Sequence, residues 1–341
     1  MQIATIMIFT GIIASTIMAA ASNSWLLAWL SLELNTLTIL PVISKPKHPR
    51  AIEAATKYFL TQTTASCLLL LAGTANAWLT GTWDITQMSN KFTSTTMLFA
   101  LTMKIGTVPT HFWLPEVLQG STMLAALLIS TWQKIAPMSL LFLISNNAQP
   151  HITLILGILS TIYGGWGGYN QTQLRKMMAY SSIANMGWTV MILTMDPNMS
   201  MINIFTYIIT AAPMFLLMKA SSTKTLKDMS TLWATSPMTA ALMALLLLSA
   251  AGLPPLTGFL PKLIIMNELV AQNLTSLAII IIMTSLLSLA FYMRTTFLAA
   301  LVTCPGSATS SMKWYFKTDT KTMFLMVIAT TSTPIMPAWI P

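Results

Sequence analysis

The stretch KIGTVPTHFWLPEV, residues 104–117, lies inside an apolar part of the chain. The segment before it reads FTSTTMLFALTM (92–103), and STMLAALLIS (121–130) follows shortly after it. A lysine, two prolines and a histidine therefore interrupt a region that otherwise has the composition of a lipid-embedded helix. Charged groups and broken helices are costly in a bilayer, so this interruption points to a function.

The composition of the whole chain places it in a membrane. Of its 341 residues, 55% are hydrophobic and 7% are charged, and the mean hydropathy is +0.71. Soluble domains carry roughly 25% charged residues, so this chain has too few to cover a surface in water. Its two cysteines, Cys67 and Cys304, lie in separate segments and predict neither a disulfide framework nor a metal site.

A spanning helix needs about 20 mainly apolar residues, and about eleven segments of this chain meet that requirement. They cover residues 2–21, 24–44, 54–79, 92–118, 121–145, 151–169, 174–195, 199–219, 237–270, 273–298 and 322–340. Membrane strands would be about 10 residues long with alternating polarity. The pattern therefore predicts an all-α, multi-pass membrane protein with a single transmembrane domain over residues 1–341.

Basic residues gather on one side of this predicted topology. Most of the 17 Lys and Arg residues fall in loops after even-numbered spans: Lys45, Lys47, Arg50, Arg175, Lys176, Lys219, Lys224, Lys227, Arg294, Lys313, Lys317 and Lys321. The opposite loops contain only Lys91. In membrane proteins, the loops that remain on the side of synthesis carry an excess of Lys and Arg. Because these residues are scattered among apolar helices and do not form a basic patch on one face, the net charge of +9 does not indicate a nucleic-acid partner.

Two further features favour synthesis inside an organelle. The chain has 27 Met and 11 Trp, an excess that fits the mitochondrial genetic code. It begins directly in an apolar segment, with no Arg-rich presequence. We therefore expect the mitochondrial inner membrane, with the N-terminus and the basic loops on the matrix side.

Four charged residues remain inside predicted spans: Glu33, Lys104, Lys134 and Lys262. Lys134 lies about 16 Å from the nearer end of its span, at 1.5 Å per residue, too far for a lysine stem to reach the interface. Desolvation favours the neutral amine, and a nearby carboxylate favours the ammonium. A row of such groups joined by water can therefore pass protons. The alternative is a structural ion pair that holds helices together.

Two predicted spans contain helix-breaking residues. Pro109 follows Lys104, and Gly252, Pro254 and Pro255 lie in the ninth span near Lys262. Unwound backbone at membrane depth lines a protein-enclosed or water-filled cavity. The two breaks are therefore predicted to mark discontinuous helices of a transporter-like fold.

The breaks also predict an internal repeat, because they are five spans apart and an odd number of spans inverts a repeat in the membrane. Residues 1–145 would form the first five-helix half and 151–298 the inverted second half, with 322–340 as a final helix.

The motifs resemble those of a known family. KIGTVPTHFWLPEV resembles the K-x-G-x-x-P-x-H-F-W-L-P motif of the antiporter-like membrane subunits of respiratory complex I and of Mrp-type cation/proton antiporters. SLELNTL (31–37), LRKMMAYSSIANMGW (174–188) and AGLPPLTGFLPK (251–262) resemble its glutamate helix, its R-x-x-A-Y-S-S-I motif and its second broken helix. The resemblance covers nearly the whole chain.

The resemblance implies a subunit of the proton-translocating NADH:ubiquinone reductase, partnered by other complex I subunits and membrane lipid. Glu33 and Lys104 would form the coupled pair, Lys134 the connecting lysine and Lys262 the lysine of the second half-channel. FMN, iron–sulfur clusters and quinone would bind to other subunits, with no cofactor or metal in this chain. Two alternatives remain: a stand-alone Mrp-like cation/proton antiporter and a structural membrane scaffold. His111 either relays protons or satisfies backbone groups freed by the break.

Overall fold

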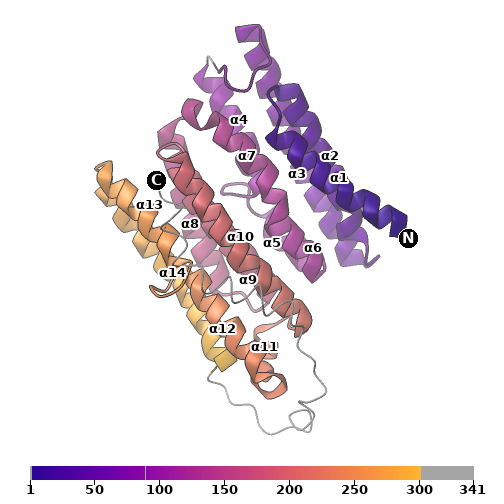
Figure 1. Cartoon of the computed structure of the whole chain (residues 1–341), viewed down its shortest axis with the longest axis vertical. Coiled ribbons are helices and arrows are strands. Elements are labelled where there is room, and N and C mark those ends of the chain that lie inside the picture. The colour runs from indigo at the N-terminus through magenta and orange to yellow at the C-terminus, as the bar shows by residue number, and fades with distance from the viewer. Residues whose placement is uncertain (1, 89, 301–341) are drawn as a thin grey trace. The chain divides into compact units, whose positions relative to one another are not determined.

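The computed structural model describes residues 2–88 and 90–300, and Figure 1 shows that the described chain is built from α-helices. Its contacts divide it into two compact units. The first unit contains residues 2–160 together with Val190–Pro197, and the second contains Thr161–Thr189 and the chain from Asn198 onward. The predicted span at 322–340 and the basic residues at 313, 317 and 321 lie outside the described residues.

The helices of the first unit are α1 (Gln2–Ala20), α2 (Trp25–Ser44), α3 (Pro49–Thr80), α4 (Lys91–Ile105), α5 (Trp113–Gly120), α6 (Met123–Ser130), α7 (Ile135–Ile144) and the first half of α8 (Pro150–Tyr169). Helix α2 packs against α1 and α3, and α3 also packs against α4 and α5. Helix α7 packs against α1 and α4. Helix α3 thus lies next to α2, α4 and α5.

The second unit contains the end of α8, most of α9 (Leu174–Ile192), α10 (Pro197–Ala220), α11 (Leu226–Thr235), α12 (Pro237–Ala251), α13 (Phe259–Ala271) and α14 (Thr275–Ala300). Helix α14 packs against α11, α12 and α13, and α11 packs against α12. The hydroxyl groups of Thr284 on α14 and Thr161 on α8 are hydrogen-bonded at 3.2 Å.

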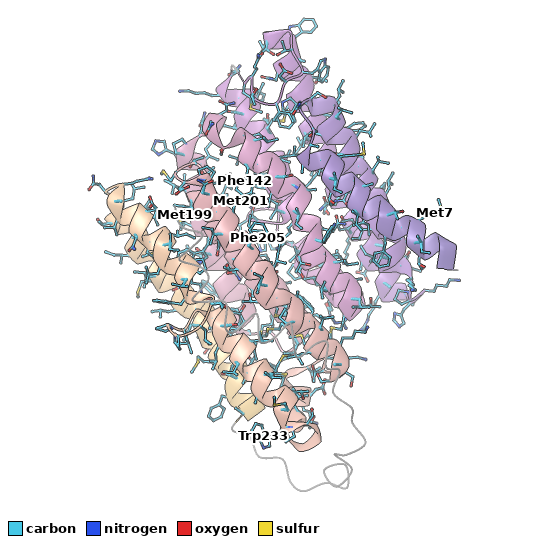
Figure 2. All side chains as sticks on the ribbon, viewed as in Figure 1. Met7, Phe142, Met199, Met201, Phe205 and Trp233 are labelled. Carbon is cyan, nitrogen blue, oxygen red and sulfur yellow. The ribbon has the colours of Figure 1, made fainter. Side chains whose placement is uncertain are left out.

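Five of these helical segments are long and apolar enough to cross a membrane: Trp25–Ser44, Met123–Asn147, Pro150–Tyr169, Pro197–Ala220 and Thr275–Ala300. Thr5–Ala20 and Pro237–Ala251 are shorter and also apolar. Large apolar side chains project from the surfaces of the units, as Figure 2 shows for Met7, 68% exposed, and Phe205, 50% exposed. Such surfaces suit lipid, and the chain is a helical, multi-pass membrane protein.

The helix that contains Lys104 stops close to that residue. Helix α4 ends at Ile105, and Gly106 adopts a φ of +86° that favours glycine. A Cβ at Gly106 would lie 3.1 Å from the ring of Trp113. The chain then passes through Pro109 and enters α5 at Trp113.

The second unit repeats this local geometry. Helix α12 is 15 residues long, like α4, and ends before Gly252, whose φ is also +86°. Helix α5 starts seven positions after Gly106, and α13 likewise starts seven positions after Gly252. GTVPTHFWLP (106–115) thus corresponds to GLPPLTGFLP (252–261), with proline at matching positions.

A third interruption differs from the continuous span expected at 121–145. Helix α6 ends at Ser130, a short 3-10 turn covers Trp132–Lys134, and α7 begins at Ile135. Pro137 explains the break, because proline has no N–H and its ring clashes with the carbonyl four residues earlier. Lys134 therefore lies at a break in its helix.

The polar connection after Lys219 contains a helix of its own. Helix α11 begins with a capping box, in which Thr225 accepts from the Asp228 N–H and the Asp228 carboxylate accepts from the Thr225 N–H at 2.8 Å. Met229 and Leu232 are buried, whereas Trp233 is 40% exposed (Figure 2).

Candidate functional site

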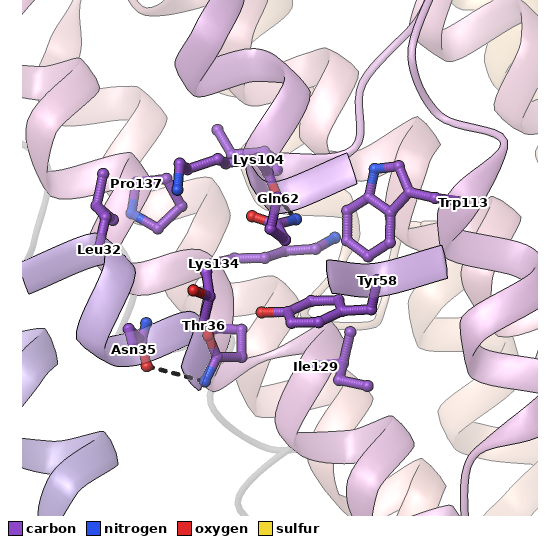
Figure 3. Close-up of a pocket in the computed structure, with 12 residues that line it drawn as sticks. Leu32, Asn35, Thr36, Tyr58, Gln62, Lys104, Trp113, Ile129, Lys134 and Pro137 are labelled. Atoms are coloured by element: carbon purple, nitrogen blue, oxygen red, sulfur yellow. Dashed lines mark hydrogen bonds between the residues drawn. The ribbon is translucent and has the colours of Figure 1, made fainter. Parts of the chain in front are cut away.

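A small cavity lies inside the first unit, and Figure 3 shows Lys104, Lys134, Tyr58 and Trp113 around it. Its lining consists of Leu32, Asn35, Thr36, Tyr58, Gln62, Lys104, Ile105, Trp113, Ile129, Gln133, Lys134 and Pro137. The cavity leaves about 20 Å³ for the centres of water molecules, and about 10–15 Å³ is enough for one water. Two lysines that are 30 positions apart in the sequence therefore share one small, hydratable space.

Lys104 reaches the cavity from the last turn of α4. The residue is 6% exposed, and its Nζ has no hydrogen-bond partner among the described residues. Gln62 on α3 donates to the backbone carbonyl of Lys104 at 3.3 Å. Since a buried ammonium needs partners, this position fits a group that meets water in the cavity.

Lys134 enters the same cavity from the 3-10 turn and is 3% exposed. The preceding residue, Gln133, donates from Nε2 to Oδ1 of Asn35 on α2 at 3.0 Å (Figure 3). Asn35 is buried, at 3% exposed. The turn that presents Lys134 is thus tied to the helix that contains Glu33.

Glu33 is held by hydroxyl groups. Its carboxylate accepts hydrogen bonds from Ser66 on α3 and from Thr36, one turn along α2, the latter at 3.0 Å. In the part of the chain that the structure describes, the ion pairs within 4.0 Å are those of Lys57, so Glu33 and Lys104 do not touch. This arrangement differs from a fixed ion pair between the two residues.

Two aromatic residues of the cavity have no counterpart among the site residues expected from the sequence. Tyr58 and Trp113 meet edge to face, with ring centroids 5.7 Å apart. The indole Nε1 of Trp113 is buried and has no partner among the described residues. A buried indole N–H is a donor, so in a residue that lines the cavity it is suited to hold a water molecule. For Trp113, the FWLP sequence (112–115) directly after the break was the signal that could have identified it.

Lys262 has a different environment in the second unit. It is half-buried, and its Nζ donates to the carbonyl of Ala251 at 2.9 Å. Ala251 ends α12, where carbonyl groups lack helical partners, so the ammonium caps the broken helix end. A Cβ at Gly252 would lie 3.0 Å from this Nζ. Because Gly252 has no Cβ, there is room for the Lys262 side chain next to it.

His111 lies in the first break and is 4% exposed. Its ring packs on Phe112, with centroids 4.2 Å apart. Among the described residues, the cavity lining includes neither His111 nor Glu33.

Lys57 forms a surface ion-pair network that sequence reasoning missed. Its Nζ lies 2.6 Å from Glu116 on α5 and 2.5 Å from Glu53 on its own helix. The contact with Glu116 ties α5, the second part of the broken helix, to α3. At the second break, the position that matches Glu116 is occupied by Lys262. Lys262 forms a hydrogen bond with the end of α12.

The described residues do not gather three or more His, Cys, Asp or Glu side chains where they could hold a metal ion. The site of the first unit consists instead of two buried lysines, hydroxyls and amides around a space for water, with the Glu33 carboxylate outside the cavity lining. This set suits proton transfer, since each group can donate, accept or orient a proton.

Comparison with known proteins identifies the family. A family model described as NADH:quinone oxidoreductase/Mrp antiporter, TM, matches residues 22–288. NADH-ubiquinone oxidoreductase chain 2 of Xenopus laevis is 46% identical over 330 residues, covering 97% of this chain and 96% of the relative. The chain belongs to the NADH-ubiquinone oxidoreductase chain 2 family. It is accordingly a membrane-arm, antiporter-like subunit of complex I, within NADH:ubiquinone oxidoreductase.

Solved structures have the same fold as this member of the chain 2 family. A chain of respiratory complex I from Thermus thermophilus with bound Aureothin matches with a TM-score of 0.84 at 22% identity, covering 97% of this chain and 79% of that one. A chain of the Mrp complex from Dietzia sp. DQ12-45-1b matches with a TM-score of 0.80 at 18% identity, covering 87% and 60%. At these identities the likeness concerns the fold alone.

Proposed function

We propose that this chain conducts protons through the membrane arm of complex I by way of Glu33, Lys104, Lys134 and Lys262. Redox energy released in other subunits would change the charge near one group, and each group would pass the change on as a protonation event. His111, in the first break, is a further proton-carrying group in this proposal.

The observation that supports this proposal most directly is the shared cavity. Lys104 and Lys134 both line it, and it has room for water. The Lys104 Nζ lies there without a hydrogen-bond partner among the described residues. Lysine suits this role because its amine can lose and regain a proton, whereas arginine keeps its charge.

The proposed architecture has about eleven spans in the mitochondrial inner membrane. Residues 1–145 and 151–298 form two inverted halves, and 322–340 a final helix. The matched spacing of Gly106 and Gly252 around the two breaks supports such a repeat. The one-sided basic loops support a matrix location for the N-terminus.

Neighbouring antiporter-like subunits are the proposed partners of this chain in the membrane, together with lipid. FMN, iron–sulfur clusters and quinone are assigned to other subunits of the complex. The chemistry of the cavity supports this division, because lysine, amide and hydroxyl groups suit protons better than electrons or metal ions.

Of the two alternatives, membership of the chain 2 family speaks against a stand-alone antiporter. A structural scaffold requires fixed partners for its buried charges. Lys262 fits that description through its bond to Ala251, whereas Lys104 does not. The scaffold explanation therefore applies best to the second unit.

Replacing Lys134 by Met tests the proposal. A proton-conducting site predicts that the complex assembles, migrates as a large NADH-oxidising band on a native gel, and loses proton translocation in sealed vesicles. Lys57→Met is the matched control, since Lys57 is exposed and outside the cavity lining. Loss of assembly in Lys134→Met with intact assembly in the control would favour the scaffold. Normal translocation by Lys134→Met would refute the proton-conducting role.

A further inference from the structure

Thr36 belongs both to the cavity lining and to the hydrogen-bond partners of Glu33. Its side chain lines the cavity shared by Lys104 and Lys134, and the residue is 4% exposed. The same hydroxyl, Oγ1, lies 3.0 Å from Oε2 of Glu33. Glu33 is not part of the cavity lining among the described residues, so Thr36 is a lining residue that is hydrogen-bonded to the carboxylate.

The hydroxyl of Thr36 has the chemistry to pass a proton. A hydroxyl donates one hydrogen and accepts through two lone pairs, so it can receive a proton on one side while giving one up on the other. The Oγ1 atom also lies 2.8 Å from the backbone carbonyl of Glu33, so its hydrogen can turn between two acceptors. The indole N–H of Trp113 and the ammonium of Lys104 only donate.

We propose that Thr36 passes protons between Glu33 and the cavity, a role that rests on the proposed function of Glu33 and Lys104. Lys104 gives a proton to a cavity water, and that water gives a proton to Oγ1 of Thr36. The original hydroxyl proton of Thr36 moves to Oε2 of Glu33. The ammonium and the carboxylate become an amine and a carboxylic acid, while Thr36 and the water end unchanged.

A simpler explanation is that Thr36 only satisfies its own helix, as hydroxyl residues in membrane helices do. Thr38 on the same helix provides the comparison. Its hydroxyl donates to the carbonyl of Asn35 at 2.9 Å, and its methyl group faces α1, where a Cβ at Gly11 would meet it at 2.8 Å. Thr38 therefore makes the same local bond, but among the described residues its hydroxyl is not bonded to a carboxylate and it does not line the cavity.

The test uses complex I assembled with variant chains and sealed in vesicles, in which protons moved per NADH oxidised are counted. Thr36→Val removes the hydroxyl and keeps the shape, Thr36→Ser keeps the hydroxyl, and Thr38→Val is the matched control. Glu33→Gln is measured alongside as the reference for a lost carboxylate. We expect Thr36→Val to lose as much translocation as Glu33→Gln, and both Thr36→Ser and Thr38→Val to keep the native ratio.

Native translocation by Thr36→Val would overturn this inference if Glu33→Gln is defective, and the proposed function would stand. Native translocation by Glu33→Gln and Lys104→Met would remove the proposed function itself. Should Thr36→Val fail to assemble, Thr36→Ala replaces it, because alanine also lacks the hydroxyl and is smaller than threonine. A native ratio in Thr36→Ala would likewise overturn the inference, and a loss matching Glu33→Gln would support it.

Discussion

Gln133 donates a hydrogen bond of 3.0 Å to Asn35, which joins the turn that presents Lys134 to the helix that contains Glu33. The bond spans 98 positions of sequence. Both amides line the cavity, so they help to set the geometry in which Lys134 meets its surroundings.

Breaking this bond from one side is expected to destabilise the complex. Gln133→Met leaves the buried Oδ1 of Asn35 without its donor, at a cost of about 1–3 kcal/mol. The double variant Asn35→Leu/Gln133→Met leaves no amide unpaired and should cost less than the sum of the single variants. The measurement is the temperature at which the NADH-oxidising band is lost from native gels. Additive effects would mean that the two amides do not act as a pair.

Comparing Gly252→Ala with Gly81→Ala separates the cost of a positive φ at a helix end from the cost of a clash between the new Cβ and a neighbouring side chain. Both glycines have positive φ, +86° and +74°, which costs another residue about 1–2 kcal/mol. Nothing lies within 4 Å of a Cβ at Gly81, whereas a Cβ at Gly252 meets Lys262. We expect the larger loss of thermal stability from Gly252→Ala, because Lys262 must also leave the Ala251 carbonyl. Equal losses would show that the lysine moves without cost.

Lys262 can be tested by changing its proton chemistry while keeping its charge. Arginine retains N–H donors for the Ala251 carbonyl but does not release its proton. If Lys262 conducts protons, Lys262→Arg assembles and loses NADH-driven translocation. If it only caps α12, Lys262→Arg translocates normally and Lys262→Met shows the assembly or stability defect.

The capping box of α11 predicts a dependence on pH. Burial acts to raise the pKa of Asp228, but the N–H groups of Lys224 and Thr225, the Thr225 hydroxyl and the charge of Lys224 together outweigh it and hold this pKa below its ordinary value of 3.8. The stabilisation is therefore complete above pH about 4 and is lost as the pH falls through the lowered pKa. Hydrogen exchange at the start of α11, corrected for intrinsic rates, should accelerate below that pH.

Asp228→Asn provides the control for the α11 prediction, because an amide does not titrate. In that variant, corrected exchange at the start of α11 should be faster at neutral pH and should not change with acid. An unchanged acid response in the variant would assign the effect to another group.

The sequence by itself determined the membrane class, the main apolar spans and the sites where two of them break. A spanning helix needs about 20 apolar residues in a row, and proline and glycine alter the backbone next to them. Both signals are local and can therefore be read from the sequence. Lys104 and Lys134 were identified as charges at membrane depth for the same reason. The spacing of Thr225 and Asp228 is that of a capping box, a local signal for the start of α11. Hydropathy did not indicate this helix.

Only the tertiary structure decided which groups meet. Glu33 faces the hydroxyls of Ser66 and Thr36 instead of touching a lysine, and Lys262 meets the end of α12. Spacing along a helix states which residues share a face, but the partner across that face depends on how distant helices pack. The cavity shared by Lys104 and Lys134 depends on such packing, because one lysine comes from α4 and the other from the 3-10 turn between α6 and α7.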